Sequence, residues 1–466
     1  MLQGLVSRRR FLYLGGALAA GGALAGRTPL SALASHADDQ TVTLTFWTPG
    51  GSARYCNEFS VIERNYERLH PNIHMTKVQC GTGQQDFLTV LLARIAAGNP
   101  PDATIYWGTP VSLAVRGAVV ALEAMMAHSQ YAQKSDWPAS ALASCAWNGK
   151  TWGLPVTAGT YAVWYNADWF AKKGIPTSRD KFPKTWDDLR KLSREFTYWK
   201  NGRLVTAGYI PMANTGSGAD LTATFFVWSA LNGGRLYDAQ HKKYTIDAEP
   251  NVAMMEYMVS WLNEEYKGDM AAVDRSGNWT GYVDAKGRPP AFQTGRLAMM
   301  EQGFWFMGDV ESYPRTFEDY RVASYPVGSG GSKTVSGYWP NWVIIPQGSK
   351  HPKEAFDWLD YLSGVGVRLW FSVTPDLPAN KKVPYLLPAV AVQKRGKAFA
   401  EDMTRFFHHQ LDISIPMWNS PVQDFATDQL LKAAANIMHK VAKPKAALAE
   451  AQRACQNQLE RTLRSS

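Results

Sequence analysis

Residues 41–51 read TVTLTFWTPGG, an alternation of threonine with apolar residues that a Pro-Gly-Gly sequence ends. This pattern predicts a β-strand. Five further elements are predicted after it as helix, strand, helix, strand and helix, at residues 58–69, 73–78, 85–97, 103–107 and 111–127. Strands that alternate with helices predict a parallel sheet with crossover helices, and such sheets bind ligands at the carboxyl ends of their strands.

The composition is that of a soluble globular protein. The chain has 466 residues, of which 45% are hydrophobic and 19% charged, without low-complexity bias. Only the N-terminal segment carries an apolar run, which excludes a polytopic membrane protein. The 18 tryptophans are an unusual surplus. Large flat side chains either fill cores or line surfaces that stack on flat ligands, and composition leaves both interpretations open.

The first 34 residues have the pattern of a cleavable export signal. Ser7-Arg8-Arg9-Arg10-Phe11-Leu12 precedes a short run rich in Ala, Gly and Leu, and Ser31-Ala32-Leu33-Ala34 offers small residues for cleavage. The segment resembles a twin-arginine signal, whose S-R-R-x-F-L core it matches at every position. We therefore expect a periplasmic or other extracytoplasmic protein, cleaved after Ala34 or, alternatively, after Ala37. The remaining 45 basic and 40 acidic residues give a net charge of +5 without basic tracts, so no nucleic-acid partner is expected.

The four cysteines, Cys56, Cys80, Cys145 and Cys455, fit neither a zinc site nor a C-x-x-C motif, and no metal site is expected. Cys56 and Cys80 are predicted to flank the first two strands, so a disulfide between them is one interpretation. The other is buried apolar thiols, because a twin-arginine substrate folds before export.

The central part of the chain contains its most specific motifs. Asn148-Gly-Lys-Thr-Trp-Gly-Leu-Pro155 predicts a tight hairpin, because an Asn-Gly pair stands between aromatic residues. A strand over 160–165 follows, and a mostly helical α/β region extends to about residue 325. A strand at 342–345, a helix at 352–362 and a helical tail at 420–464 complete the prediction.

These motifs, in this order, resemble the extracellular solute-binding proteins, family 1, that feed ABC importers of sugars and related polyols. The resemblance covers almost all of the chain after the signal. Its most specific parts are the hairpin motif, Tyr165-Asn166-Ala-Asp168-Trp-Phe170 with Gly174-Ile175, and Pro183-Lys184-Thr185-Trp186-Asp187-Asp188-Leu189. Weaker support comes from Ala97-Gly98-Asn99-Pro100-Pro101-Asp102, Gly295–Met300 with Gly303-Phe304-Trp305, and Lys350–Ala355.

The resemblance implies a two-lobed periplasmic-binding-protein fold of type II-like form, with α/β lobes that close on a ligand by a hinge. Lobe one would comprise residues 40–156 plus 328–366, and lobe two 157–327 plus 367–466. The crossovers would lie near residues 156–157, 325–326 and 364–366. It also implies a monomer without cofactor or catalytic activity, which binds a carbohydrate between the lobes and delivers it to membrane permease subunits.

A sugar needs aromatic rings for its apolar faces and polar anchors for its hydroxyls. Trp47 and Trp107 end predicted strands, where they either stack on the ligand or fill the lobe core. Gln84 precedes a helix, as a ligand contact or a helix cap. The resemblance implies four further candidate ligand contacts, in loops and at the ends of segments: Trp305, Tyr338, Trp339 and Asp376. Weaker candidates come from lobe two: Tyr161, Asn214, Trp228, Trp279 and Trp418. Four other tryptophans are assigned to packing: Trp164, Trp169, Trp186 and Trp358.

Two alternatives remain open. Glycerol-3-phosphate or another anionic polyol would need a phosphate site, for which Ser52-Ala53-Arg54 lies at a predicted helix start. An exported glycoside hydrolase would need two carboxylates on facing walls. Acidic residues are available at Asp86, Asp220, Glu301 and Asp376, but no motif pairs them as acid and base. We therefore expect a binding protein for a neutral carbohydrate.

Overall fold

The structure is a computed structural model. It describes residues 41–50, 53–76, 78–81, 84–213, 218–284, 286–416 and 419–465, and at a few helical positions only the backbone. The predicted export signal and its cleavage sites lie outside the described residues. None of the helices described is long and apolar enough to cross a membrane.

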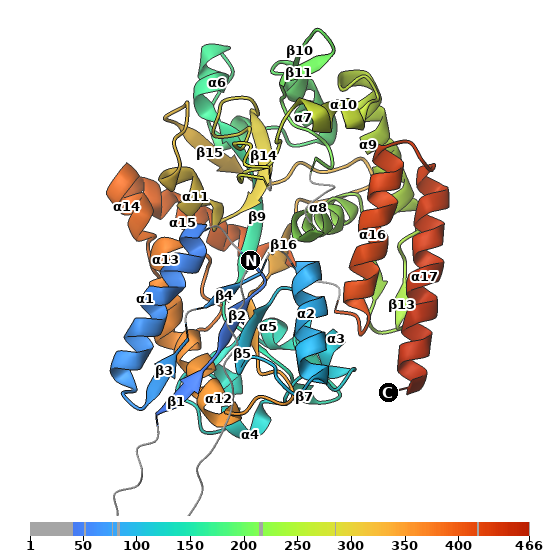
Figure 1. Cartoon of the computed structure of the whole chain (residues 1–466). Helices are drawn as coiled ribbons and strands as arrows, with labels where there is room; N and C mark the ends of the chain where they lie inside the picture. Colours follow the sequence, from blue (N-terminus) through green and yellow to red (C-terminus); the bar gives the residue numbers. More distant parts are fainter. Residues whose placement is uncertain are drawn as a thin grey trace, which may run out of the picture. The chain divides into compact units, whose positions relative to one another are not determined.

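The N-terminal part of the chain forms the predicted parallel α/β unit (Figure 1). The first sheet has the strand order β4-β2-β5-β17-β8. Its strands are β4 (Gln79–Cys80), β2 (Phe46–Thr48), β5 (Ala103–Tyr106), β17 (Trp342–Ile344) and β8 (Leu154–Pro155). β2 runs parallel to β4 and β5, whereas β17 is antiparallel to β5 and β8. The predicted strand at 41–47 is divided at Thr45, because β1 (Val42–Leu44) pairs separately with β3 (Ile73–Met75).

Two long helices cover opposite faces of this sheet. Successive side chains of a strand point to opposite faces. Phe46 accordingly meets Phe59 of α1 (Ala53–Leu69), with ring centroids 5.6 Å apart. Trp47 meets Phe87 of α2 (Gln84–Ala96) at 6.2 Å. α12 (Pro352–Tyr361) shares the α1 face, where Trp358 lies 5.3 Å from Phe46.

The second sheet is built around β9 (Gly159–Asn166), whose eight residues are all buried. Its strand order is β14-β9-β16-β18, and β15 also pairs with β9. Its other strands are β14 (Met299–Gly303), β15 (Tyr320–Ala323), β16 (Ser336–Trp339) and β18 (Ser414–Ile415). The helices nearest to it are α8 (Gly218–Leu231) against β16 and α15 (Lys397–Asp412) against β9 and β16.

The sequence motifs have local physical causes. Asn148 and Gly149 adopt positive φ angles of 49° and 75° between β6 (Ala146–Trp147) and β7 (Lys150–Thr151), which forms the predicted hairpin. Asn166 caps α6 (Ala167–Lys172) by accepting a hydrogen bond from the Trp169 N–H. Thr185 caps α7 (Trp186–Arg194) in the same way through the Asp188 N–H.

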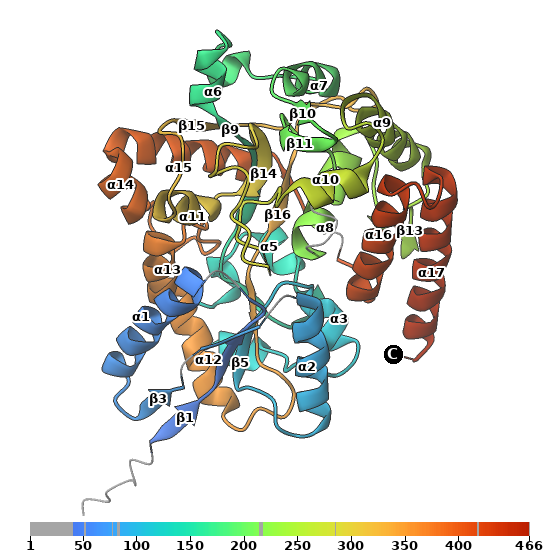
Figure 2. The ribbon, with the colours of Figure 1, turned by 45° about the horizontal axis from the view of Figure 1, so that its top comes forward.

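The remaining elements surround the two sheets (Figure 2). Their helices are α3 (Pro110–Ala114), α4 (Glu123–Met126), α5 (Ala139–Ala143), α9 (Glu249–Glu265), α10 (Met270–Ser276), α11 (Phe306–Ser312), α13 (Val367–Val373), α14 (Ala389–Arg395), α16 (Gln423–Met438) and α17 (Pro444–Ser465). Two short hairpins are β10–β11 (Tyr198–Lys200, Arg203–Thr206) and β12–β13 (Tyr237–Asp238, Lys243–Tyr244). α16 and α17 lie side by side in both views.

Strand pairing shows where the chain passes between the sheets. The first passage lies between β8 and β9, at Val156–Ala158. The second lies at Pro340–Asn341, because β16 pairs with β9 and not with the first sheet. The third follows α13, because Trp370 of that helix packs on Phe59 of α1 at 4.9 Å. The second and third passages therefore differ from the predicted crossovers at 325–326 and 364–366.

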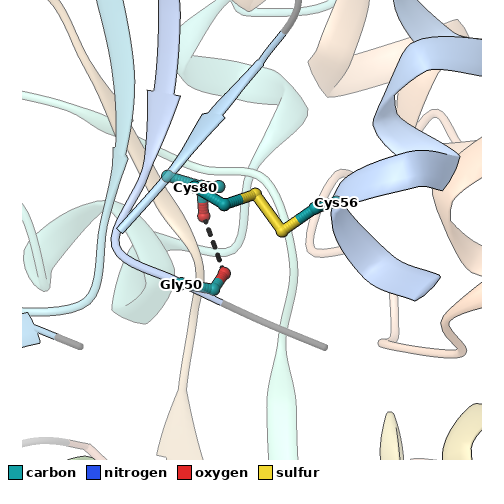
Figure 3. The surroundings of a disulfide bond; sticks show 4 residues. Gly50, Cys56 and Cys80 are labelled. Atoms are coloured by element: carbon teal, nitrogen blue, oxygen red, sulfur yellow. Dashed lines mark hydrogen bonds between the residues drawn. A yellow bond between two sulfur atoms is a disulfide. The ribbon is translucent and has the colours of Figure 1, made fainter. Parts of the chain in front are cut away.

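A disulfide joins Cys56 in α1 to Cys80 at the end of β4, with Cα atoms 6.3 Å apart (Figure 3). Of the two interpretations of these cysteines, the disulfide is confirmed. Cys145 and Cys455 are free and buried. The packing role predicted for four tryptophans is also confirmed: Trp164, Trp186 and Trp358 are buried, and Trp169 packs on the same core.

Candidate functional site

The three passages between the sheets meet in a cluster of three polar residues, of which two are buried and one is half-buried. Thr157 belongs to the first passage, Asn341 to the second and Asp376 to the third. The Thr157 hydroxyl donates to Asp376 Oδ2 at 2.7 Å, and Asn341 Nδ2 donates to the same oxygen at 2.8 Å. Backbone hydrogen bonds support the contact, since the Ala158 N–H donates to the Leu377 carbonyl at 2.6 Å. We call Thr157, Asn341 and Asp376 the crossing cluster.

Asp376 is the unusual member of this cluster. Its side chain is only 2% exposed, and its Oδ1 atom has no hydrogen-bond partner in the part of the chain that the structure describes. Burial raises the pKa of Asp376 to about 7, although the hydrogen bonds from Thr157 and Asn341 act in the opposite direction. A buried carboxylate oxygen without a donor is costly, which identifies this atom as one that a bound molecule could satisfy.

Aromatic side chains stand next to this oxygen. The half-buried indole of Trp305 meets Tyr161 edge-on, with centroids 5.0 Å apart and planes at 89°, and its Nε1 donates to the Tyr282 hydroxyl at 3.1 Å. A Cβ atom at Gly159 would lie 2.9 Å from the Trp305 ring and 3.2 Å from Asp376 Oδ1. The ring and the carboxylate therefore converge on Gly159, where the lack of a side chain permits their approach.

Three more of the predicted residues lie around the same point. Trp107 is half-buried at the end of β5, and its Nε1 donates to Asn341 Oδ1 at 2.8 Å. The Tyr338 hydroxyl is buried and, among the described residues, has no hydrogen-bond partner; burial raises its pKa, with a smaller contribution from the charge of Asp376. Trp339 is half-buried and pairs with Gly159 across β16 and β9. The structure thus gathers six predicted residues: Trp107, Tyr161, Trp305, Tyr338, Trp339 and Asp376.

Three other predicted residues lie in packing positions. Trp47 is 9% exposed in the core between β2 and α2, where Arg94 lies 5.8 Å from its ring centroid. Trp228 is buried and donates to Glu301 Oε2 at 3.1 Å. Trp279 is buried, donates to the Val273 carbonyl at 2.8 Å and lies beneath Arg296. For Trp47, the structure therefore favours the core interpretation over stacking on a ligand.

The last three predicted site residues are Gln84, Asn214 and Trp418. Asn214, Trp418 and the side chain of Gln84 lie outside the described residues. The same holds for Ser52 and the side chain of Arg54, on which the predicted phosphate site depends.

Of the acidic residues available to a hydrolase, Glu301 is held by hydrogen bonds from Tyr209 and Trp228, and burial raises its pKa.

Sequence reasoning missed Thr157, Asn341 and Tyr282 as members of the site. The only sequence signal for Asn341 is its position directly before the predicted strand at 342–345. Its hydrogen-bond partners Thr157 and Asp376 lie 184 and 35 residues away in the chain, so local sequence patterns do not reveal these contacts. No group of three or more His, Cys, Asp or Glu side chains among the described residues is placed to hold a metal ion.

A second contact joins α16 to the first sheet near Trp107. Asp424 of α16 is half-buried and accepts hydrogen bonds from the Tyr106 hydroxyl at 2.9 Å and from the Ser112 hydroxyl. Asn419, just before α16, contacts Thr109 and donates from Nδ2 to the Ala143 carbonyl at 3.2 Å. Burial raises the pKa of Asp424, and the two hydroxyl donors partly compensate.

Comparison with known proteins identifies the family. The model of the bacterial extracellular solute-binding protein family matches residues 58–368. An uncharacterised ABC transporter extracellular-binding protein of Pyrococcus horikoshii is 23% identical over 71% of this chain and 70% of its own length. A probable sugar-binding periplasmic protein of Brucella suis is 27% identical over 67% of this chain and 68% of its own length.

Solved structures share the fold. CpMnBP1 with mannotriose bound superposes with a TM-score of 0.72 at 22% identity, over 88% of this chain and 99% of that one. Maltose-bound MalE3 of T. maritima superposes at 0.71 and 16% identity, over 90% and 100%. The predicted two-lobed periplasmic-binding-protein fold is thereby confirmed. Because the family model covers two thirds of the sequence and the fold agrees over nine tenths, this chain belongs to the bacterial extracellular solute-binding proteins.

Proposed function

We propose that this protein is the extracytoplasmic binding subunit of an ABC importer and that it binds a neutral mono- or oligosaccharide. The observation that carries the proposal is the convergence of the Trp305 ring and the buried Asp376 Oδ1 on Gly159. A sugar presents an apolar face beside donating hydroxyls, and this pair offers a partner for each. Relatives named as sugar-binding periplasmic proteins support the same ligand class.

The ligand contacts in this proposal are the six gathered residues: Trp107, Tyr161, Trp305, Tyr338, Trp339 and Asp376. They lie where the chain passes between the two sheets, so a ligand there would touch groups from both. We propose that lobe one contains the first sheet with α12 and α13, and that lobe two contains the second sheet with α16 and α17. Ligand contacts available only when the lobes are closed would shift the population toward closure.

The remaining parts of the proposal concern partners and export. The closed form would be recognised by separate permease subunits, and the binding subunit would act as a monomer without catalysis. The N-terminal segment would direct export by the twin-arginine route and be cleaved after Ala34 or Ala37. N-terminal sequencing of the exported protein tests the cleavage site, and replacing Arg8 and Arg9 by Lys tests the route, since export should then stop.

A thermal-shift screen tests the ligand class. The probes are mannotriose, maltose, tagatose and glycerol-3-phosphate, because a ligand that binds only the folded state raises the melting temperature. At pH 8, where Asp376 is mostly ionised, we expect one or more neutral sugars to raise it and glycerol-3-phosphate to leave it unchanged, because the carboxylate would repel the anion. A shift with glycerol-3-phosphate alone would contradict the neutral ligand, and release of shorter sugars from an oligosaccharide would contradict a purely binding role.

A further inference from the structure

Both polar atoms of the half-buried Asn341 amide are hydrogen-bonded to other residues of the site. Oδ1 accepts the hydrogen bond from Trp107 Nε1 at 2.8 Å, while Nδ2 donates to Thr157 Oγ1 at 2.9 Å and to Asp376 Oδ2 at 2.8 Å. An indole N–H can only donate, so the atom that faces Trp107 must be the amide oxygen. The amide nitrogen is then necessarily turned toward Thr157 and Asp376.

The hydroxyl of Thr157 completes the arrangement. It accepts from Nδ2 of Asn341 and from the Asn341 backbone N–H at 3.1 Å, and it donates to Asp376 Oδ2 at 2.7 Å. A hydroxyl has one proton and two lone pairs, so its capacity is filled. Three segments that are remote in sequence are thus joined through one amide and one hydroxyl.

These hydrogen bonds fix the orientation of the Asp376 carboxylate. Its Oδ2 atom accepts both cluster hydrogen bonds, which leaves Oδ1 without a partner and turned toward Gly159 and the Trp305 ring. If the amide of Asn341 were absent, the carboxylate would lose one of the two side-chain donors that set this rotation, and Trp107 would lose its hydrogen bond to the crossing cluster. The Asn341 side chain therefore orients both the Trp107 indole and the Asp376 carboxylate.

We propose that Asn341 is a positioning residue, which holds the Trp107 indole and the Asp376 carboxylate so that Oδ1 is presented to a donating hydroxyl of the ligand. The inference rests on the proposed function and narrows it. The ligand must bring a hydroxyl to Oδ1 beside the apolar face that packs on Trp305. Asn341 would affect the ligand indirectly, through the positions of Trp107 and Asp376.

The variants are Asn341→Ala and, as a matched control, Asn251→Ala. Asn251 is buried, whereas Asn341 is half-buried, and the Asn251 amide likewise makes several hydrogen bonds, including those to the carbonyl groups of Arg235 and Thr245, but it lies in α9. Both changes remove an amide whose nitrogen and oxygen are both hydrogen-bonded, so both should lower the melting temperature. Only Asn341→Ala should weaken sugar binding, by tenfold or more, whereas Asn251→Ala should keep the affinity within twofold.

Two readouts separate positioning from general destabilisation. The first is a double-mutant cycle with Asp376→Asn, measured by calorimetry with whichever of mannotriose, maltose or tagatose binds the wild type most tightly. On the Asp376→Asn background, Asn341→Ala should cost less than threefold, because part of what it positions is already lost. Equal losses on both backgrounds overturn the proposal.

The second readout needs no ligand. In protein labelled with ¹⁵N at the indole nitrogens, the Trp107 signal is assigned by its disappearance in Trp107→Phe. Hydrogen exchange of this N–H should accelerate at least tenfold in Asn341→Ala and stay unchanged in Asn251→Ala. Unchanged exchange in Asn341→Ala overturns the proposal. If wild-type protein binds no sugar, the proposed function fails, while the exchange result still decides whether Asn341 positions Trp107.

A second variant covers the case that Asn341→Ala does not fold. Thr157→Val keeps the shape of the side chain but removes the hydroxyl that links Asn341 to Asp376. It should weaken binding at least fivefold, and Thr157→Ser, which restores the hydroxyl, should recover the affinity to within twofold. Failure of Thr157→Ser to recover binding while Thr157→Val loses it would show that shape and not hydrogen bonding matters, which overturns the proposal.

Discussion

The indole of Trp305 and the ring of Tyr161 meet edge-on at 5.0 Å, one from the loop after β14 and the other from β9. Tyr161 is buried, while Trp305 keeps part of its surface accessible. The buried ring therefore fixes the accessible one in place beside Asp376 Oδ1. A pre-oriented aromatic surface loses little entropy when a ligand stacks on it, which is the property that a sugar site requires.

The first prediction concerns this surface. Trp305→Ala should weaken sugar binding about fivefold to thirtyfold, because the ligand loses an aromatic contact worth about 1–2 kcal/mol. Titration calorimetry measures the change, and thermal unfolding checks the fold. If Trp305→Ala binds as tightly as the wild type, the ligand does not stack on this ring.

Trp279 supplies the matched comparison. Like Trp305, it lies within residues 157–327 of the predicted lobe two, but it is 4% exposed and hydrogen-bonded to the Val273 carbonyl. Trp279→Ala should lower the free energy of unfolding by about 3–5 kcal/mol through cavity formation, with affinity unchanged at temperatures where the variant is folded. Denaturant titration and calorimetry measure the two quantities. Loss of affinity without loss of stability would return Trp279 to the site.

The pH dependence of stability should report the buried Asp376. Its pKa is about 7 in the folded protein and near the ordinary value of about 3.9 when unfolded, so folding favours the protonated form. This contribution is fully present below about pH 4 and is lost as pH rises through about 7, which amounts to about 2–3 kcal/mol between pH 5 and pH 8.

Guanidinium titrations of ligand-free protein at pH 5 and pH 8 measure this slope. Glu301 and Asp424 act in the same direction, because burial raises both of their pKa values. The difference between wild type and Asp376→Asn isolates the one carboxyl. An identical slope in the two proteins would mean that Asp376 is ionised across this range.

The disulfide should stabilise the N-terminal unit. It closes a loop with a sequence separation of 24 residues, which corresponds to about 3 kcal/mol of reduced entropy in the unfolded chain. A reducing agent should lower the denaturation midpoint of the wild type toward that of Cys56→Ser/Cys80→Ser, and it should leave the double variant unchanged. A wild-type midpoint that does not respond to reduction while free thiols appear would contradict this contribution.

The contact of α16 with the first sheet gives the last prediction. Tyr106→Phe removes one of two hydroxyl donors to the half-buried carboxylate of Asp424 and should lower the free energy of unfolding by about 1–3 kcal/mol. Tyr385→Phe is the control, because Tyr385 is 57% exposed. Gly108→Ala should destabilise as well, since the new methyl group would meet Asp424 and Tyr106 at 2.5 and 2.8 Å. Equal stability of Tyr106→Phe and Tyr385→Phe would show that α16 is held by other contacts.

Much of the fold could be predicted because its signals are local. The strand-helix alternation up to residue 107, the Asn148-Gly149 hairpin and the starts of α6 and α7 depend on periodicity, turn conformation and helix caps within a few residues. The passages between the sheets were harder to locate. β16 looks like any short aromatic strand, and only its pairing with β9, across more than 170 residues, assigns it to the second sheet.

By itself, the sequence determined the α/β class, the family motifs and a pool of aromatic and acidic residues from which the site is drawn. Which tryptophans line the site was decided by tertiary structure. Trp47 and Trp107 are both predicted to end strands, yet Trp47 lies within β2, faces α2 and packs in a core, whereas Trp107 follows β5 and reaches Asn341. The direction of a side chain at a strand end depends on pairing register and on partners that are distant in the chain. For the same reason, the surplus of tryptophan acquires a function only at the few positions where the three passages meet.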